Sequence, residues 1–442
     1  MNKSNDSKVE VEVKVEVNGN GIETPINQAK AEPQATKWWT VDKAIPVREQ
    51  ACIAEAAAML AAGQTIAFPT ETVYGLGANA CDAEAVQRIF AAKGRPSDNP
   101  LIVHIADMAQ LDELVLPYGD TAKRLMERFW PGPLTIVLPV RPQAVSSSVT
   151  AGLDTVGVRM PAHDTALALI RAAGRPIAAP SANRSGRPSP TRAEHVRADL
   201  DGRIGGIVDG GPAGVGVEST VLEVQGDRVH VLRPGGITTA MLREVAAEVT
   251  VDPAVDPNGG MTEAAPPVTP SSAPSSTKRM ADHAAGLAAG TPMEEPAAGF
   301  MSEQVADRSA GLSPVQPAPR SPGMKYTHYA PQGTLSIVKG VSAERVSQCI
   351  QAELDAAKQR GETTGVLAFR EHAERYRADI VVSLGSVEAL EEAAHYLYDA
   401  LRHFDEAGAT YMLAEACPTE GMGLAVMNRL VKAAGHRIIR CQ

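Results

Sequence analysis

The sequence has no long apolar run. None of its 442 residues lies in a hydrophobic stretch that approaches the roughly 20 residues needed to span a bilayer. The first forty residues are rich in Glu, Asp and Asn and have no apolar core, so they resemble neither a secretory signal nor an Arg-rich transit peptide. We therefore expect a soluble protein with a cytoplasmic location.

Cysteine is also scarce, and its spacing is uninformative. No two of the five cysteines have the short spacing that is typical of a zinc site or a redox dithiol. The sequence therefore predicts reduced thiols and identifies no metal ligands. These cysteines are Cys52, Cys81, Cys349, Cys417 and Cys441.

Two common nucleotide-binding motifs are missing as well. The glycine-rich segment at 204–224 does not contain G-x-x-x-x-G-K-[ST], which disfavours a P-loop NTPase. No G-x-G-x-x-G follows a predicted strand and opens a helix, so the main signal of a dinucleotide-binding fold is absent. A nucleotide would have to be held in another way.

The net charge of −10 argues against a nonspecific nucleic-acid binder. Its distribution leaves an alternative open, because residues 171–203 contain seven Arg and only three acidic residues. This cluster is compatible with a basic surface and hence with a noncatalytic module that binds double-stranded RNA. A solvated surface is an equally good interpretation.

Changes in composition divide the chain into five parts. Two segments cannot bury enough apolar surface to offset the entropy of ordering, which predicts a disordered tail and a flexible linker. The linker is followed by a dense aromatic segment, SPGMKYTHYAP. The predicted parts are a tail at 1–36, a globular α/β domain at 37–250, the linker at 251–320, a docking or lid segment at 321–333, and a C-terminal α/β domain at 334–442.

Residues 66–105 form the centre of the first globular part. An apolar run that ends at Pro69 is followed by a polar turn with Gly75 and Gly77, a segment with helical spacing that ends near Gly94, and a second apolar run at 101–105. This order predicts a strand, a glycine-bearing loop, a helix and a strand. In the C-terminal part, alternating strands and helices predict a largely parallel sheet.

Polar residues gather at the ends of these elements. Thr70 and Thr72 offer hydroxyl groups beside the glycines, and Lys93 and Arg95 place two cations at the end of the helix. The pattern predicts an anion-binding site. The alternative is a solvated turn with helix-end charges that complement the helix dipole.

Two further arginines follow predicted strands. Arg159 either caps its strand in water or binds a ligand carboxylate, which suits its planar guanidinium group. Arg233 could meet phosphate or stack on adenine. Between them, a Ser- and Asn-rich loop begins at Ser181, and simple turn chemistry would also explain its composition.

The motifs PTETVYGLG, KGRPSDNPL with His104, SAN-x-SG and GLAVMNRLVKAAG together resemble the YrdC-type threonylcarbamoyl-AMP synthase family in its long, two-domain form. The resemblance covers roughly residues 49–249 and 321–441. It implies an α/β fold with a YrdC-like twisted, open, mixed sheet and a smaller, Rossmann-like C-terminal domain.

The resemblance also implies an activity and partners. Such enzymes join L-threonine, bicarbonate and ATP, with Mg²⁺, into threonylcarbamoyl-adenylate and release pyrophosphate. The product serves tRNA modification by a downstream threonylcarbamoyl transferase machinery, and direct contact with RNA is left open. A carbamoyltransferase of hydrogenase maturation contains a related domain, but those proteins also carry cysteine-rich zinc motifs, which this sequence lacks.

Carried over position by position, the resemblance assigns three sets of site residues. Phosphate-neutralising catalytic roles fall to Lys93 and Arg95. L-threonine binding falls to Thr70, Thr72, His104, Arg159, Ala179 and Ser219. ATP binding falls to Arg95, Asn99, Thr155, Ser181, Asn183, Ser189, Arg233 and Tyr326. In the aromatic segment, Tyr326 is expected to belong to a lid over the nucleotide, whereas the alternative is a simple anchor for the linker.

Overall fold

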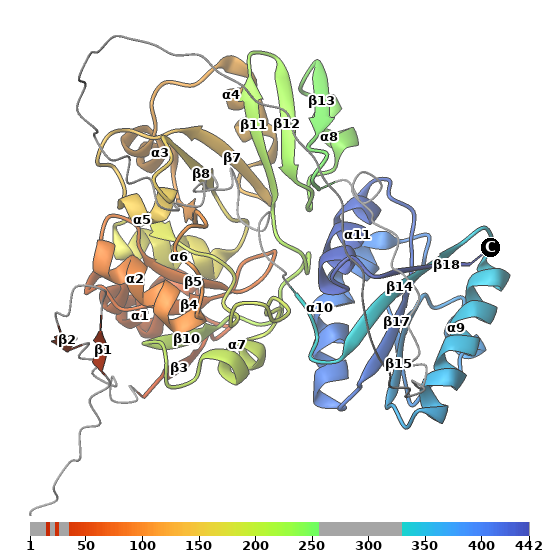
Figure 1. Cartoon of the computed structure of the whole chain (residues 1–442). Helices are drawn as coiled ribbons and strands as arrows, with labels where there is room; N and C mark the ends of the chain where they lie inside the picture. The colour runs from red at the N-terminus through yellow and green to blue at the C-terminus, as the bar shows by residue number, and fades with distance from the viewer. Residues whose placement is uncertain (1–14, 18–22, 26–34, 256–328, 442) are drawn as a thin grey trace, which may run out of the picture. The chain divides into compact units, whose positions relative to one another are not determined.

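The computed structural model of the chain describes residues 15–17, 23–25, 35–255 and 329–441 (Figure 1). Its first block contains an eleven-stranded mixed sheet in the order β13-β12-β11-β7-β8-β6-β9-β5-β4-β10-β3. The strands are β3 (Lys37–Thr40), β4 (Ile66–Phe68), β5 (Gly75–Asn79), β6 (Ile102–His104), β7 (Leu134–Pro139), β8 (Thr155–Arg159), β9 (Ile177–Ala178), β10 (Gly206–Asp209), β11 (Thr220–Gln225), β12 (Arg228–Arg233) and β13 (Glu248–Val251).

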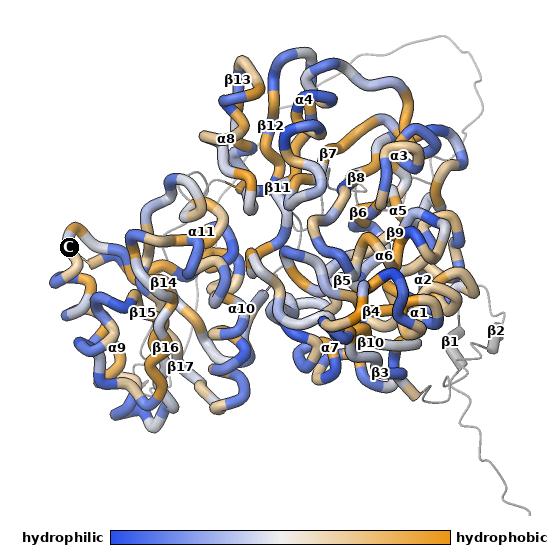
Figure 2. Tube along the Cα trace, turned by 180° about the vertical axis from the view of Figure 1, so that it is seen from behind, coloured by the Kyte–Doolittle hydropathy of each residue, from blue (hydrophilic) through white to orange (hydrophobic). Residues whose placement is uncertain are grey.

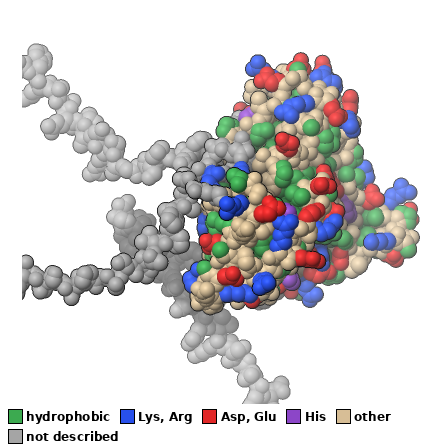
Figure 3. All heavy atoms as spheres, turned by 90° about the vertical axis from the view of Figure 1, so that its right-hand side faces the viewer, with side chains coloured by type: hydrophobic (Ala, Val, Ile, Leu, Met, Phe, Trp, Pro, Cys, Tyr) green, Lys and Arg blue, Asp and Glu red, His purple; other side chains and the backbone are tan. Residues whose placement is uncertain are grey.

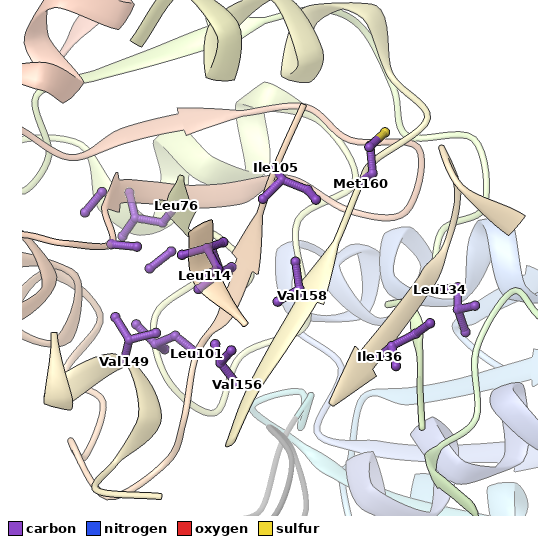
Figure 4. Close-up of a cluster of buried hydrophobic side chains, with 14 of the residues drawn as sticks. Leu76, Leu101, Ile105, Leu114, Leu134, Ile136, Val149, Val156, Val158 and Met160 are labelled. Atoms are coloured by element: carbon purple, nitrogen blue, oxygen red, sulfur yellow. The ribbon is translucent and has the colours of Figure 1, made fainter. Parts of the chain in front are cut away.

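Helices cover both faces of this sheet, because neighbouring residues of a strand point to opposite sides. Ile66 and Phe68 of β4 pack into one buried cluster with α1 and α6, whereas Ala67 packs into another with α2, α3 and α4. Figure 4 shows part of the second cluster, in which Val156 and Val158 of β8 belong to the same core. The helices are α1 (Ala51–Ala61), α2 (Ala83–Lys93), α3 (Met108–Leu114), α4 (Asp120–Phe129), α5 (Ser147–Thr150), α6 (Asp164–Ala173), α7 (Ala193–Leu200) and α8 (Thr239–Arg243), with a 3-10 turn at Val47–Glu49.

The second block is a five-stranded, fully parallel sheet in the order β16-β15-β17-β14-β18. Helix α9 packs on one face with Val338 and Val366, and α10 and α11 pack on the other with Ile337 and Leu367. In Figure 2 the strands of both sheets are mainly hydrophobic, while the polar residues of α9 lie on one side of the helix. The elements are β14 (Thr334–Gly340), α9 (Ala343–Gln359), β15 (Thr364–Ala368), a 3-10 turn (Ala373–Arg375), β16 (Ile380–Ser383), α10 (Leu390–Glu406), β17 (Tyr411–Glu415), α11 (Met422–Ala433) and β18 (Ile438–Cys441).

The predicted α/β fold class is confirmed, with one local correction. The glycine-bearing segment is the strand β5, antiparallel to β4, and not a loop. A Cβ atom on Gly77 would lie 2.8 Å from both Ile177 and Phe68. Glycine is therefore needed at this position because the strand packs closely against its neighbours. The sequence alone does not distinguish a glycine required for close packing in a strand from a glycine in a loop.

Two other expectations change. The tail at 1–36 was predicted to be disordered, but within it β1 (Val15–Val17) pairs antiparallel with β2 (Glu23–Pro25). The predicted linker begins slightly too early, because Val255 is buried and its carbonyl accepts a hydrogen bond from Asn428. Residues 256–328, which contain the rest of the linker and Tyr326, lie outside the described residues.

The expectation that all cysteines are reduced is wrong for two of them. Cys349 on α9 and Cys441 at the end of β18 form a disulfide, with their Cα atoms 6.3 Å apart. They are 92 residues apart in sequence. They come together because β18 pairs with β14 and α9 packs on this part of the sheet. Sequence spacing could not reveal this pair.

Candidate active site

A cavity in the first block gathers most of the predicted site residues. The cavity is small, with a volume of about 60 Å³, and it is partly open to solvent. Eleven predicted residues line it, namely Thr70, Thr72, Lys93, Arg95, His104, Arg159, Ala179, Ser181, Asn183, Ser219 and Arg233.

Three other predicted residues do not line this cavity. Asn99 is fully buried, and Ser189 is buried and donates a hydrogen bond to Glu218 at 2.5 Å. Thr155 begins β8 and borders a separate, small cavity beside Leu101 and Val221. Their assignment to ATP stays a prediction, as does that of Tyr326, which lies outside the described residues.

Strand register explains why one end of the cavity can hold a carboxylate. Strand β6 runs parallel to β8 with His104 directly opposite Arg159. Arg159 is buried and donates from Nη1 to Thr72 Oγ1 at 2.9 Å and from Nε to the Gly132 carbonyl at 3.2 Å. Two residues far apart in sequence thus meet at the ends of neighbouring strands.

Arg159 also has an acidic partner that sequence reasoning missed. Its Nη2 atom lies 2.5 Å from Glu71 Oε2, and both side chains are largely buried. Glu71 sits between Thr70 and Thr72, whose hydroxyl oxygens are 2.8 Å apart. A carboxylate therefore already occupies one side of the guanidinium group. Its position between two predicted site residues was the available sequence signal.

Burial keeps His104 uncharged. Removal from water lowers the pKa of His104 first, and the neighbouring Arg159 charge lowers it further, to about 3. The imidazole is therefore neutral at physiological pH and can either donate or accept a hydrogen bond. Its ring packs edge-on against Phe68, with 6.2 Å between ring centroids.

The end of α2 places two cations at the cavity. Asp82 caps the start of the helix through the backbone N–H groups of Glu84 and Ala85, and Gly94 ends it in a left-handed conformation with φ of 62°. Lys93 and Arg95 flank this glycine. Lys93 is buried, and burial first and then the Arg95 charge lower its pKa well below the ordinary value.

Lys93 is already engaged with the loop after β9. Its Nζ donates to the Ser181 carbonyl and, at 2.5 Å, to the Asn183 carbonyl, and it also lies 3.3 Å from Asn183 Oδ1. An ammonium group has three donors, so all of them have partners in the protein. In this structure Lys93 fixes the serine- and asparagine-rich loop.

The far wall of the cavity comes from the pair β11–β12. Antiparallel register places Arg233 opposite Val221, close to Ser219, which directly precedes β11. Arg233 donates from Nε to the Ser219 carbonyl and from Nη2 to Ser219 Oγ, both at 3.1 Å. Ser219 Oγ lies 2.8 Å from Thr135 Oγ1 on β7. Arg233 is thus held at the cavity by the backbone and the side chain of Ser219.

Seven lining residues were not predicted as site residues, among them Glu218 and Tyr329. Glu218 precedes Ser219 in the sequence, and Tyr329 belongs to the aromatic segment that the sequence singled out. Both are buried. Tyr329 brings the end of this segment to the cavity, whereas the lid and the ATP contact of Tyr326 stay predictions.

The arginine cluster at 171–203 does not form one basic surface. Arg187 pairs with Asp199 at 2.6 Å, and Arg192 pairs with Asp399 of α10 at 2.8 Å. Arg197 lies over the ring of Trp38, 5.7 Å from its centroid. On the face shown in Figure 3, acidic and basic side chains are interspersed. No feature of the described residues favours the RNA-binding alternative.

No group of three or more His, Cys, Asp or Glu residues within the described parts of the chain is arranged to hold a metal ion. Likewise, the described helices include none that is both long and apolar enough to cross a bilayer.

The fold and the cavity together define an α/β protein with a candidate small-molecule site, which is lined by the buried Arg159 and by the cations Lys93 and Arg95. Family models narrow this class. The model described as telomere recombination (Sua5/YciO/YrdC) matches residues 58–235, and the model described as threonylcarbamoyl-AMP synthase, C-terminal domain, matches residues 298–435. The chain belongs to the threonylcarbamoyl-AMP synthase family.

Individual relatives agree over nearly the whole chain. The threonylcarbamoyl-AMP synthase of Bacillus subtilis is 49% identical over 92% of this chain and 99% of its own length. That of Pyrococcus abyssi is 42% identical over 87% of this chain and 94% of its own length. The crystal structure of P. abyssi Sua5 complexed with L-threonine aligns with a TM-score of 0.73, at 41% identity, over 92% of this chain and all of that one.

Proposed function

We propose that this chain condenses L-threonine, bicarbonate and ATP into threonylcarbamoyl-AMP, with release of pyrophosphate. Family membership supports the reaction. The observation that carries the proposal at the level of residues is a single cavity with two chemically different ends. One end holds Arg159, His104 and Thr72, and the other holds Arg95, Arg233 and the loop that Lys93 fixes.

The first end suits threonine. A guanidinium group binds a carboxylate through two parallel hydrogen bonds, and Arg159 is held in place by Gly132 and Thr72. To bind there, the carboxylate of threonine would share or replace the contact that Glu71 makes with Arg159. Neutral His104 and the hydroxyl of Thr72 would then face the remaining polar groups of the amino acid.

The second end suits a polyphosphate. The amine of threonine attacks the carbon of bicarbonate and water leaves. An oxygen of the resulting carbamate then attacks the α-phosphorus of ATP, and pyrophosphate leaves. This step needs charge neutralisation and positioning rather than a protein nucleophile. Arg95 and Arg233 would supply positive charge, and Lys93 would hold Ser181 and Asn183 in place.

Mg²⁺ would enter with ATP and be held largely by the phosphate oxygens, as is usual for nucleotide-bound Mg²⁺. The product would pass to the machinery that transfers the threonylcarbamoyl group to tRNA. We also propose a cytoplasmic location, where the protein would meet that machinery.

Mass spectrometry of a mixture of the protein, ATP, Mg²⁺, bicarbonate and L-threonine tests the proposal. Threonylcarbamoyl-adenylate should form together with pyrophosphate, and ¹³C-bicarbonate should increase its mass by one unit. Omission of threonine or bicarbonate should abolish the product. Pyrophosphate release that does not depend on threonine would contradict the proposed reaction.

A further inference from the structure

The C-terminal block reaches the cavity through one buried ionic cluster. Arg429 of α11 is fully buried and donates from Nε to Glu218 Oε2 at 3.0 Å. Tyr398 of α10 donates its hydroxyl to the same carboxylate at 2.9 Å. Glu218 itself lines the cavity and also accepts a hydrogen bond from Ser189.

Arg429 also holds two backbone positions that lie next to cavity residues. Its Nη1 donates to the Pro234 carbonyl at 2.6 Å, and its Nη2 to the Glu218 carbonyl at 3.4 Å. Pro234 follows Arg233, and Glu218 precedes Ser219. One guanidinium group from α11 therefore restrains both segments that supply the Ser219–Arg233 wall.

The surroundings leave this wall little freedom. A Cβ atom on Gly235 would lie 2.3 Å from the Thr220 nitrogen and 2.4 Å from the Glu218 carbonyl oxygen, so the two segments are in close backbone contact. The ring of Tyr398 packs on that of Tyr329, with 5.1 Å between centroids, and Tyr329 lines the cavity. The side chains of α10 and α11 in this cluster thus contact two cavity residues directly, Glu218 and Tyr329. Through the backbone they also restrain the neighbouring Ser219 and Arg233.

Charge balance keeps the cluster ionised. Burial by itself would raise the pKa of Glu218, but the charges of Arg429 and then Arg233 lower it to about 2. Glu218 therefore remains a carboxylate at physiological pH. Arg429 donates its Nε hydrogen bond to the Glu218 carboxylate, whereas Arg233 donates its hydrogen bonds to Ser219 at the cavity wall.

We propose that Glu218 is a positioning residue for Arg233 at the nucleotide end of the cavity, and that the C-terminal block completes this end by fixing Glu218 and Arg233 through Arg429 and Tyr398. This inference rests on the proposed function for the identity of the ligand. It gives the second block a role in nucleotide affinity, although the described part of that block contributes no side chain to the cavity wall except Tyr329.

Four variants of the full-length chain test the role. Glu218→Gln and Arg429→Met break the ion pair, and Tyr398→Phe removes only a hydroxyl and keeps the ring that packs on Tyr329. The matched control is Glu415→Gln. Glu415 is a buried carboxylate of the C-terminal block that accepts a hydrogen bond from the Phe369 backbone N–H at 2.8 Å and lies 3.1 Å from His372 Nδ1, and it does not line the cavity.

Steady-state kinetics provide the first readout. In Glu218→Gln and Arg429→Met, the KM for ATP should rise about tenfold or more, the expected effect of losing a charge-assisted buried contact. The KM for threonine should change much less, and Tyr398→Phe should show a smaller change of the same kind. Glu415→Gln should keep the wild-type KM for ATP even if its melting temperature falls as far.

Hydrogen exchange provides a readout that does not require the proposed reaction. Backbone amides in 219–237 should exchange faster in Glu218→Gln and Arg429→Met than in wild type or Glu415→Gln. An equal rise in the KM for ATP in Glu415→Gln, or unchanged exchange in 219–237, would overturn the positioning role. Failure of the wild-type protein to form the adenylate would instead refute the proposed function, and the exchange measurement would still decide the role of Glu218.

Discussion

At the scale of single residues, the cavity is built from side chains whose charges are set by burial. Arg159 is held in place by Thr72, Gly132 and Glu71, so its guanidinium group has a fixed position in the cavity. His104, directly opposite on β6, is kept neutral. A fixed cation beside a neutral imidazole can distinguish the carboxylate of an amino acid from its other polar groups.

The first prediction concerns Arg159. In Arg159→Ala the KM for threonine should rise by on the order of a hundredfold, because a charge-assisted contact to a carboxylate is lost in a buried site. The KM for ATP should change less. Arg171→Ala is a suitable control, since Arg171 on α6 donates to the Ala106 carbonyl and does not line the cavity. An unchanged threonine KM would remove Arg159 from the threonine site.

The second prediction concerns the pH dependence of stability. His104 is neutral in the folded protein down to about pH 3, whereas the ordinary pKa of histidine is 6.5. Below pH 6.5 the unfolded chain therefore binds a proton that the folded protein does not. The free energy of unfolding should fall on acidification between pH 6.5 and about 3, by at most about 1.4 kcal/mol per pH unit from this residue.

Denaturant unfolding between pH 7 and pH 4 measures this effect. His104→Gln should be less stable than wild type at pH 7, but the difference between the two proteins should shrink as the pH falls. Parallel stability curves for the two proteins would show that His104 does not titrate as described.

At the scale of elements, register decides which residues meet. The parallel pairing of β6 with β8 brings together His104 and Arg159, and the antiparallel pairing of β11 with β12 brings Arg233 to Ser219. The helix α2 ends at Gly94 so that its last residue and the one after the glycine reach the same cavity. The disulfide between α9 and β18 is a similar product of element packing.

The third prediction concerns this disulfide. Cys441→Ser should lower the free energy of unfolding of the oxidised protein, by as much as about 4 kcal/mol on the chain-entropy account of a long closed loop. In the presence of a thiol reductant the variant and the wild type should have similar stability. A thiol count of five in unfolded, unreduced wild-type protein would contradict the bond.

At the scale of the whole molecule, buried contacts join the two described blocks. Val73 and Val217 of the first block share a hydrophobic cluster with α10 and α11, and Arg402 and Arg429 pair with buried carboxylates of the first block. Gly216 lies at this junction, and its backbone N–H donates to the Thr72 carbonyl at 3.1 Å. Through this hydrogen bond the junction contacts Thr72, which lines the end of the cavity proposed for threonine.

The fourth prediction concerns Gly216. A Cβ atom there would lie 2.4 Å from the Ala394 carbonyl oxygen and from the His395 Cα, and the φ of 83° adds strain. Gly216→Ala should lower the melting temperature and raise the KM for threonine. Gly226→Ala is the matched control, because Gly226 also has a positive φ, of 61°, but has nothing within 4 Å of the new atom. Equal effects of both changes would show that strain alone, and not the junction, is responsible.

The sequence by itself determined the fold class, most element positions and most of the cavity lining. The alternating strands and helices predicted for the C-terminal part are observed, and the motif residues from Thr70 to Arg233 meet because they lie in the strands and loops of one fold. Local signals such as the Asp82 cap and Gly94 act within a few residues, so they can be read without the rest of the chain.

The tertiary structure decided what depends on contacts between distant segments. The strand conformation of β5, the pairing of Cys349 with Cys441 and the engagement of Lys93 with Asn183 each depend on residues far away in sequence. The same holds for Glu218, whose partner Arg429 is 211 positions away. Burial and charge pairing set the roles of these groups, and neither is encoded in local spacing.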